Sequence, residues 1–238
     1  MKVVAIIRST LFYVGYALFV ALFSLLSSTL GYALPLRHRQ TLATTGNFLI
    51  QKWLTLVCGI KVKVIGADNI PDTPVVILSN HQSPWETYYL QRQLRPVSTI
   101  LKRELLSIPF FGWGLASVKP IAIYRDNPRQ ALKDVMTQGK ERLAAGMNVV
   151  VYPEGTRIAY GKTGNYARSG AALAVAAKVP VLPVAHNAGR LWPSKELLKK
   201  PGTITIVYGK PIASDSGDSK AITQQAKDWI TETQKKIG

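Results

Sequence analysis

The sequence is poor in the residues that build disulfide frameworks and metal centres. Cys58 is the only cysteine among 238 residues, which excludes an intrachain disulfide and a cysteine-based metal site. Acidic residues are scarce too, because 13 Asp and Glu stand against 30 Lys and Arg, a formal charge of +17. This imbalance favours an anionic partner such as nucleic acid, anionic lipid headgroups or phosphorylated molecules.

Sequence features of nucleic-acid-binding modules are also missing. The chain has no zinc-ligand spacing, no aromatic pattern of an RNA-binding sheet and no block of Lys and Arg. It shows neither internal repeats nor low-complexity linkers. We therefore predict one domain with lipid partners and no nucleic acid. A nucleic-acid-binding protein tethered to a membrane is a disfavoured alternative.

Charged residues are absent from residue 9 to residue 36. As a helix rising about 1.5 Å per residue, this run would exceed the roughly 30 Å hydrocarbon core of a bilayer. Lys2 and Arg8 precede it as in a signal peptide, but the run is too long for a typical signal and no clear A-x-A site follows. We predict an uncleaved anchor, either one tilted span or a re-entrant element that breaks at Gly31 or Pro35.

A second helix is predicted over residues 41–57 and ends at Gly59. Trp53 and Lys52 suit a membrane interface, and packing on the domain core is an equal alternative. We expect residues 1–58 to form membrane-anchoring helices and residues 59–238 to form the main domain. Basic residues flank both ends of the apolar run, so the positive-inside rule orients it only weakly.

Short β-branched stretches then alternate with helical ones. This alternation predicts an α/β fold, a mainly parallel or mixed sheet flanked by helices. The predicted strands are 62–65, 75–78, 98–101, 121–124, 149–152, 181–184 and 203–208, and the predicted helices are 129–145, 166–178 and 220–235.

An imidazole and a carboxylate follow the predicted strand 75–78. His81 lies just past the strand end, the usual place for chemistry in α/β folds. Ser83, Pro84 and Glu86 predict a helix start, with Ser83 as N-cap, Pro84 at the first helical position and Glu86 closing a capping box. A turn there lets His81 fold back over Glu86 as a base with its orienting carboxylate. The alternative is that Glu86 only caps the helix.

The strand 149–152 runs into a P-E-G-T-R loop over residues 153–157. Gly155 would let backbone amides approach an anion, Thr156 offers a hydroxyl, and Arg157 offers a two-pronged grip. The loop predicts a phosphate site, with a turn carrying a surface ion pair as the alternative.

Two cations stand beside an apolar segment in residues 102–113. Lys102 and Arg103 would meet a headgroup, and Arg125, after strand 121–124, is a further phosphate candidate. A buried loop with snorkelling cations is the alternative. The apolar residues expected to line an acyl channel or lie in the membrane surface are Leu105, Ile108, Phe110, Phe111 and Trp113.

In this order, the stretches resemble the blocks of the glycerolipid acyltransferase family, in particular the lysophosphatidic acid acyltransferases of bacterial membranes. Residues 80–86 look like its H-x-x-x-x-D block, and residues 102–125 are similar to its second block, which ends I-x-I-x-R. Residues 152–157 look like F-P-E-G-T-R with Tyr152 for Phe, and residues 179–184 are similar to V-P-V-x-P-V. Glu86 departs from the family's Asp, so the dyad requires a compensating backbone.

The resemblance implies a 1-acylglycerol-3-phosphate O-acyltransferase, which moves an acyl chain from a thioester to the sn-2 hydroxyl of 1-acyl-sn-glycerol-3-phosphate and gives phosphatidic acid. His81 would be the general base and Glu86 would hold its tautomer. Glu154 is the odd member of the phosphate site and would instead orient Arg157 or the loop. The residues expected near the phosphate are Lys102, Arg125, Glu154, Gly155, Thr156 and Arg157.

The same resemblance implies no bound cofactor or metal, and acyl-CoA or acyl-acyl carrier protein as donor. The expected partners are membrane lipids, lysophosphatidic acid and acyl carrier protein, at the bacterial inner membrane with the catalytic domain on the cytoplasmic side. Alternatives are an acyltransferase for another lysophospholipid or lyso-aminolipid, and a non-catalytic lipid-binding protein indifferent to His81. His186 ends the stretch 181–185 and is expected near the same sheet edge as His81, and His38 is expected to contact headgroups or solvent.

Overall fold

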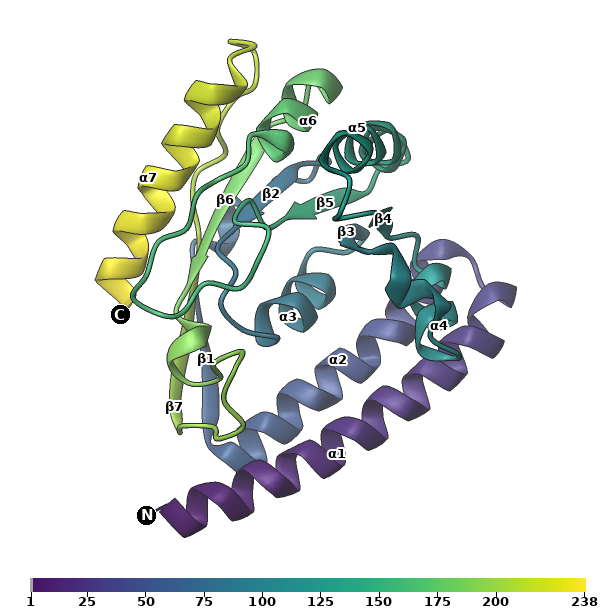
Figure 1. The fold of residues 1–238 in the computed structure, drawn as a ribbon, viewed down its shortest axis with the longest axis vertical. Helices are drawn as coiled ribbons and strands as arrows, with labels where there is room; N and C mark the ends of the chain where they lie inside the picture. The colour runs from purple at the N-terminus through teal and green to yellow at the C-terminus, as the bar shows by residue number, and fades with distance from the viewer. Residues whose placement is uncertain (1) are drawn as a thin grey trace.

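The computed structural model describes residues 2–238 and is built on one seven-stranded sheet (Figure 1). The strands lie in the order β1-β7-β6-β2-β5-β3-β4. All neighbours run parallel except β6 and β7, which are antiparallel. The bounds are Ile60–Ile65 (β1), Val76–Ser79 (β2), Val97–Lys102 (β3), Ile121–Ile123 (β4), Asn148–Val151 (β5), Val181–His186 (β6) and Gly202–Tyr208 (β7).

Helices cover both faces of this sheet, which confirms the predicted mixed α/β fold (Figure 1). The α-helices are Lys2–Thr29 (α1), Leu36–Cys58 (α2), Trp85–Gln93 (α3), Phe111–Ser117 (α4), Pro128–Ala144 (α5), Ser169–Ala177 (α6) and Ser219–Ile237 (α7). Short 3-10 helices span Gly31–Ala33, Ala67–Asn69, Arg103–Ser107 and Ala188–Arg190.

Two hydrophobic cores lie on opposite faces of the sheet. Ile77 points into the core shared with α1, α2 and α3, whereas Val76 and Leu78 point into the core shared with α5, α6 and α7. Because both faces are covered, all four residues of β2 are buried, and the first three form a continuous apolar run rather than an alternating one. The central strands are therefore a rigid support for whatever follows their ends.

The uncharged N-terminal run does not form one continuous helix. α1 ends at Thr29, a 3-10 turn follows over Gly31–Ala33, and α2 begins after Pro35. The chain thus breaks at both Gly31 and Pro35. α1 and α2 then pack side by side, and α1 also packs on α4 (Figure 1).

The outer face of α1 is apolar. The helix has 28 residues and contains an 18-residue window with a mean hydropathy of 1.9, so by length and composition it could cross a membrane. In the fold, however, its inner face is packed on the domain. The large apolar side chains that stay exposed on it include Val3, Ile7, Leu11, Val14, Leu18, Leu22 and Leu25.

The predicted start of α3 is wrong by one residue. The helix begins at Trp85 with Pro84 as its N-cap residue, not with Ser83 in that place. The reason is that the Ser83 hydroxyl accepts the N–H of Trp85 at 3.1 Å, two residues on, instead of a later helical N–H. The other half of the capping box is formed, because Glu86 Oε1 accepts the N–H of Ser83 at 2.9 Å.

Candidate active site

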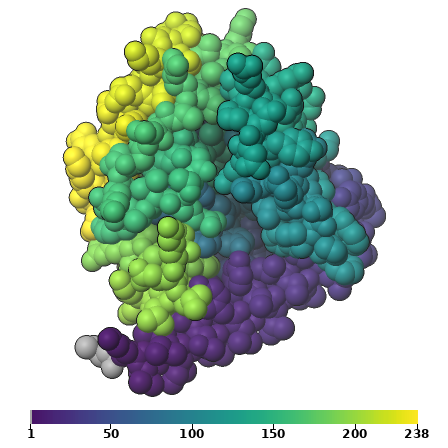
Figure 2. Space-filling view, viewed as in Figure 1, coloured from purple at the N-terminus to yellow at the C-terminus, as the bar shows by residue number. Residues whose placement is uncertain are grey.

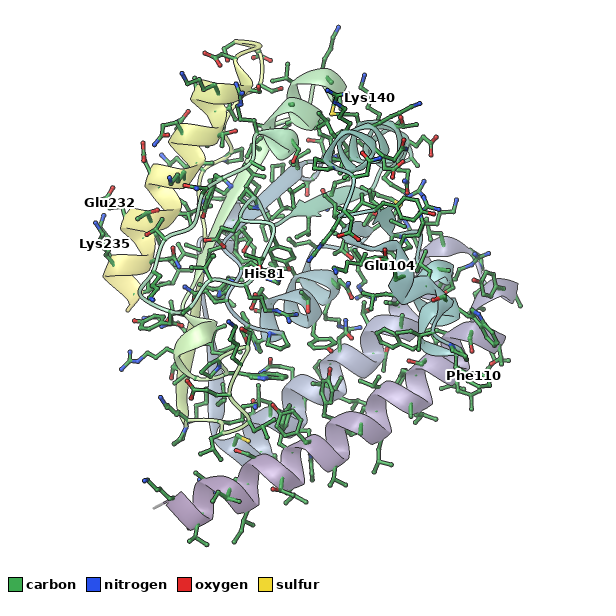
Figure 3. The ribbon with its side chains drawn as sticks, viewed as in Figure 1. His81, Glu104, Phe110, Lys140, Glu232 and Lys235 are labelled. Atoms are coloured by element: carbon green, nitrogen blue, oxygen red, sulfur yellow. The ribbon has the colours of Figure 1, made fainter. Side chains whose placement is uncertain are left out.

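The ends of neighbouring strands bring the predicted site residues to one edge of the sheet. β2, β5, β3 and β4 are consecutive and parallel, so their carboxyl ends face the same way. His81 follows β2 and Arg157 follows β5. Lys102 ends β3 and Arg125 follows β4. Figure 3 shows His81 near the middle of the molecule, beyond this edge.

His81 and Glu86 are in direct contact. His81 Nδ1 lies 2.8 Å from Glu86 Oε1. Because a carboxylate only accepts hydrogen bonds, Nδ1 carries the proton and the lone pair is on Nε2. Glu86 is fully buried, whereas His81 is 9 % exposed and lines the main cavity. The arrangement is a ring with its basic nitrogen available and a buried carboxylate that fixes its tautomer.

Glu86 also holds the backbone around it. The oxygen that contacts His81 accepts the N–H groups of Gln82 and Ser83, each at 2.9 Å. These bonds fold the loop after β2 back over the start of α3. Burial raises the pKa of Glu86, but the rings of His186 and His81 and the Ser83 N–H together hold it below its ordinary value. Glu86 therefore caps the helix and contacts His81 at once.

The loop after β5 grips the backbone of His81. Glu154 Oε2 accepts the N–H of His81 at 2.7 Å, and the Ile158 N–H donates to the His81 carbonyl at 2.7 Å. The Tyr152 ring stacks on the imidazole, with centroids 4.2 Å apart and planes inclined by 18°. These contacts fix the imidazole relative to the cavity from a segment distant in sequence.

The position of Glu154 explains why a carboxylate stands beside a predicted phosphate site. It is absent from the cavity wall that the described residues form, and its side chain is directed to backbone N–H groups instead. Burial raises its pKa to about 7, although the N–H groups of His81 and Gly164 act to lower it. Glu154 thus ties the loop to His81.

A cavity of about 970 Å³ adjoins His81. Figure 2 shows the molecule hollowed between the teal and green segments, above the purple N-terminal helices. Polar residues on its wall include His81, Lys102, Arg125, Thr156 and Arg157, and Gly155 also lines it. Its apolar wall comes from several helices and includes Phe19, Phe23, Ile50, Phe111, Leu115 and Leu132.

The apolar segment after β3 divides between cavity and surface. Leu105 and Phe111 line the cavity, as predicted for an acyl channel. Ile108, Phe110 and Trp113 are exposed by 43 to 49 % instead. Figure 3 places Phe110 at the periphery of the molecule, beside α4.

The loop after β5 leaves anion-binding groups available. Gly155 adopts φ of 66°, a left-handed conformation that favours glycine. Thr156 and Arg157 are exposed at the cavity, and among residues 2–238 the Arg157 guanidinium has no hydrogen-bond or ion-pair partner. A guanidinium in this state can grip a phosphate with two parallel hydrogen bonds.

The remaining candidates lie outside the cavity wall that the described residues form. His38 is exposed near the start of α2, and Cys58 is buried at its end. His186 is fully buried at the end of β6, close to Glu86. Over residues 2–238, no three His, Cys, Asp or Glu side chains gather as a metal site would require.

Comparison with known proteins matches this geometry to one family. The acyltransferase domain family matches residues 61–187, from β1 to the residue after β6. A 1-acyl-sn-glycerol-3-phosphate acyltransferase from Pseudomonas aeruginosa is 45 % identical over all of this chain and 94 % of its own length. The chain belongs to the acyltransferase family. The resemblance read from the four sequence blocks is thereby confirmed.

Two more distant proteins are also similar to this chain. A 1-acyl-sn-glycerol-3-phosphate acyltransferase from Saccharomyces cerevisiae is 27 % identical over 79 % of this chain and 68 % of its own. The crystal structure of a 1-acyl-sn-glycerophosphate acyltransferase from Thermotoga maritima has a TM-score of 0.81, with 21 % identity, over 99 % of this chain and 97 % of that one. At this identity the likeness shows the fold alone.

Sequence reasoning missed two parts of the site. Tyr152 was read only as a substitute for Phe, and no spacing signals that its ring stacks on His81. The cavity walls contributed by α1 and α2 were missed as well, because residues such as Phe23 and Ile50 read equally as membrane or core residues.

Proposed function

We propose that this acyltransferase transfers an acyl chain from an acyl thioester to the sn-2 hydroxyl of 1-acyl-sn-glycerol-3-phosphate, giving phosphatidic acid for phospholipid synthesis. The observation that carries the proposal is that one cavity is lined by three features: His81 oriented by Glu86, the Arg157 guanidinium, and an apolar wall. The full-length similarity to the Pseudomonas aeruginosa protein supports the acceptor.

His81 is the general base in this proposal. Its Nε2 takes the proton of the sn-2 hydroxyl while Glu86 stabilises the imidazolium that forms. The acceptor oxygen attacks the thioester carbonyl carbon, a C–O ester bond forms and the C–S bond breaks. The proton on His81 then passes to the departing thiolate. This route needs no acyl-enzyme, and so no nucleophile beside the dyad.

The cations of the cavity hold the phosphate. Arg157 provides the two-pronged contact, while Gly155 and Thr156 provide backbone and hydroxyl donors. Lys102 and Arg125, at the ends of neighbouring strands, add positive charge. Glu154 acts indirectly, through the backbone of His81.

The apolar wall holds an acyl chain, and the outer stripe of α1 holds the protein against lipid. Residues 1–58 then serve as the membrane-anchoring part and residues 59–238 as the acyltransferase domain. The charge of +17 attracts anionic lipid headgroups and an acidic donor such as acyl carrier protein, with acyl-CoA as the other donor. The expected location is the bacterial inner membrane, with the catalytic domain on the cytoplasmic side.

The proposal is tested with purified protein reconstituted in vesicles. Acyl transfer is measured from acyl-CoA and from acyl-acyl carrier protein to lysophosphatidic acid, with a second lysophospholipid alongside. Wild type, His81→Ala and His38→Ala are compared, His38 being an exposed histidine outside the cavity wall. We expect wild type and His38→Ala to form phosphatidic acid, and His81→Ala to lose about 10²- to 10⁴-fold in rate.

Each other outcome rejects a part of the proposal. Equal use of the second lysophospholipid would reject the assigned headgroup and favour an acyltransferase of the same fold for another acceptor. Lipid binding without product in any combination would favour a non-catalytic lipid-binding protein. Full activity of His81→Ala would reject the dyad.

A further inference from the structure

One oxygen of Glu86 has no hydrogen-bond donor. Oε1 accepts three N–H groups, whereas Oε2 is buried without a partner among residues 2–238. Opposite Oε2 lies the ring of His186, with Nε2 3.9 Å away and both side chains 0 % exposed. A buried carboxylate oxygen without a hydrogen-bond donor is costly, so the N–H of this ring contributes to the state of Glu86.

The hydrogen bonds of His186 fix its tautomer. The Ala188 N–H donates to Nδ1 at 3.3 Å, so Nδ1 is the unprotonated nitrogen. Nε2 lies 2.9 Å from the backbone carbonyl oxygen of Asn80. A carbonyl oxygen only accepts hydrogen bonds, so Nε2 carries the proton. Burial lowers the pKa of His186 and so favours the neutral ring, although Glu86 acts to raise this pKa. A neutral imidazole thus directs its N–H edge to Asn80 and, at longer range, to Glu86.

Asn80 joins His186 to the segment that carries His81. The Asn80 side chain donates to the His186 carbonyl and accepts the His186 N–H, both at 3.0 Å. Since β2 and β6 are parallel neighbours, these bonds clamp their carboxyl ends together one residue before His81. His186 itself lies outside the wall that the described residues form around the cavity.

We propose that His186 is a positioning residue of the His81–Glu86 pair: a neutral, Nε2-protonated imidazole that keeps Glu86 anionic and fixes the strand end before His81. The inference rests on the proposed acyl transfer and adds a third group to that site. It requires no contact between His186 and the substrate.

The groups around the His81–Glu86 pair determine how strongly the N–H of His186 affects its protonation. Among the described residues, Tyr152 and Glu154 from the end of β5 lie near Glu86 and supply no positive charge. The cations Lys102, Arg125 and Arg157 line the cavity on the His81 side of the pair. Removing the N–H of His186 therefore destabilises the unprotonated His81–Glu86 pair relative to the pair with one added proton, whichever residue holds that proton. The pair then takes up its proton at a higher pH.

Two substitutions of His186 test the proposal in the vesicle assay. His186→Leu removes the N–H, and His186→Gln keeps an amide N–H at a similar reach. For His186→Leu we expect the acidic limb of the kcat/KM profile to move up by about half a pH unit to one unit, with kcat lowered about tenfold and KM unchanged. His186→Gln should restore the limb and bring kcat to within about threefold of wild type.

Asn187→Leu is the matched control. Asn187 is 3 % exposed at the same strand end, but its side chain bonds Thr205 and Ile237 rather than the dyad. We expect a lower Tm with an unmoved acidic limb. The proposal is overturned by an unmoved limb in His186→Leu, by His186→Gln behaving like His186→Leu, or by a limb that moves equally in Asn187→Leu.

A readout without turnover separates this inference from the proposed function. The chain has three histidines, so ring ¹⁵N NMR of wild type and His186→Gln identifies the His186 signal. We expect an Nε2-protonated ring that does not titrate between about pH 5.5 and 8.5. An Nδ1-protonated or titrating ring overturns the inference even if acyl transfer is found, whereas failure of wild type to transfer an acyl chain would reject the proposed function alone.

Discussion

Glu86 reaches His81 with one more methylene than the aspartate typical of the family motif. The backbone accommodates this length because Glu86 is the second residue of α3 and its carboxylate lies over the preceding loop. Its Oε1 accepts hydrogen bonds from the imidazole and from two backbone N–H groups. The longer side chain is therefore part of the turn, and its length and the turn geometry depend on each other.

Substitution of Glu86 distinguishes orientation of His81 from helix capping. Glu86→Gln should keep a hydrogen-bond acceptor for the loop but lose the charge that stabilises the imidazolium, and kcat should fall about 10²- to 10⁴-fold. Glu86→Asp keeps the charge and should lose about tenfold. Steady-state kinetics and Tm are measured for both. Equal kinetic losses that follow the Tm would favour a cap without a catalytic role.

Arg157 is expected to act on binding of the acceptor. Arg157→Ala should raise the KM for lysophosphatidic acid about tenfold or more and change kcat little, because a phosphate contact is made in ground state and transition state alike. Lys162→Ala is the control, since Lys162 is an exposed cation of the same loop outside the cavity wall. A lower kcat at unchanged KM would contradict phosphate anchoring.

At this scale the sequence predicted contacts that depend on nearby residues and missed those that depend on the fold. The approach of Glu86 to His81 follows from a loop and a capping box. The bonds from Glu154 and Ile158 to the backbone of His81 do not, because any residue type offers the same N–H and carbonyl. His186 could be placed at the sheet edge, but its tautomer depends on Ala188 and Asn80.

Between elements, a buried lysine fastens α1 to the loop before β7. Lys199 is 3 % exposed; its backbone N–H donates to Ser9 at 2.9 Å, and its ammonium lies 4.2 Å from the Tyr13 ring centroid and 5.1 Å from that of Trp192. Burial lowers its pKa to about 8. The aromatic rings offset part of the cost of burying this charge.

This contact predicts a pH-dependent stability. Because the pKa of Lys199 is lower in the fold than in the unfolded chain, the unfolded chain binds more protons between about pH 8 and 10, and stability rises with pH there. Relative to Lys199→Met, wild type should gain about 2–4 °C in Tm between pH 7.5 and 9.5, measured in detergent micelles. A Tm difference that stays constant over this range would contradict the assignment.

The bounds of the elements were predictable where local sequence decides them. The strands were predictable from β-branched runs, which are buried because helices cover both faces of the sheet. α6 begins at Ser169 rather than at residue 166, because the N–H of Ala167 bonds the carbonyl of Pro153 in the loop after β5. Such long-range bonds override local helix propensity and leave no mark in the sequence.

At the scale of the whole molecule, α1 lies on the far side of the sheet from α7 (Figure 1). It carries the stripe of exposed apolar side chains. Leu11→Glu/Leu18→Glu places two charges on that stripe, at side chains 48 % and 65 % exposed, without touching the core. We expect binding to anionic vesicles to fall about tenfold or more in a sedimentation assay, with activity on detergent-dispersed substrate retained.

The control for this variant adds the same charge elsewhere. Ser216 precedes α7 and Gln225 lies within it, and both residues are exposed. Ser216→Glu/Gln225→Glu should bind vesicles nearly as wild type does. If both double variants lose binding equally, the total charge and not the α1 stripe holds the protein at the membrane.

The walls of the cavity include side chains from α1, the helix whose opposite face is the apolar stripe. We therefore expect an acceptor to enter from the plane of the lipid, without dissolving in water on its way to His81. The concentration that governs saturation is then a surface density, the mole fraction of lysophosphatidic acid in the bilayer. Adding inert phospholipid at constant bulk substrate should slow the reaction by surface dilution, as a soluble-substrate rate law would not.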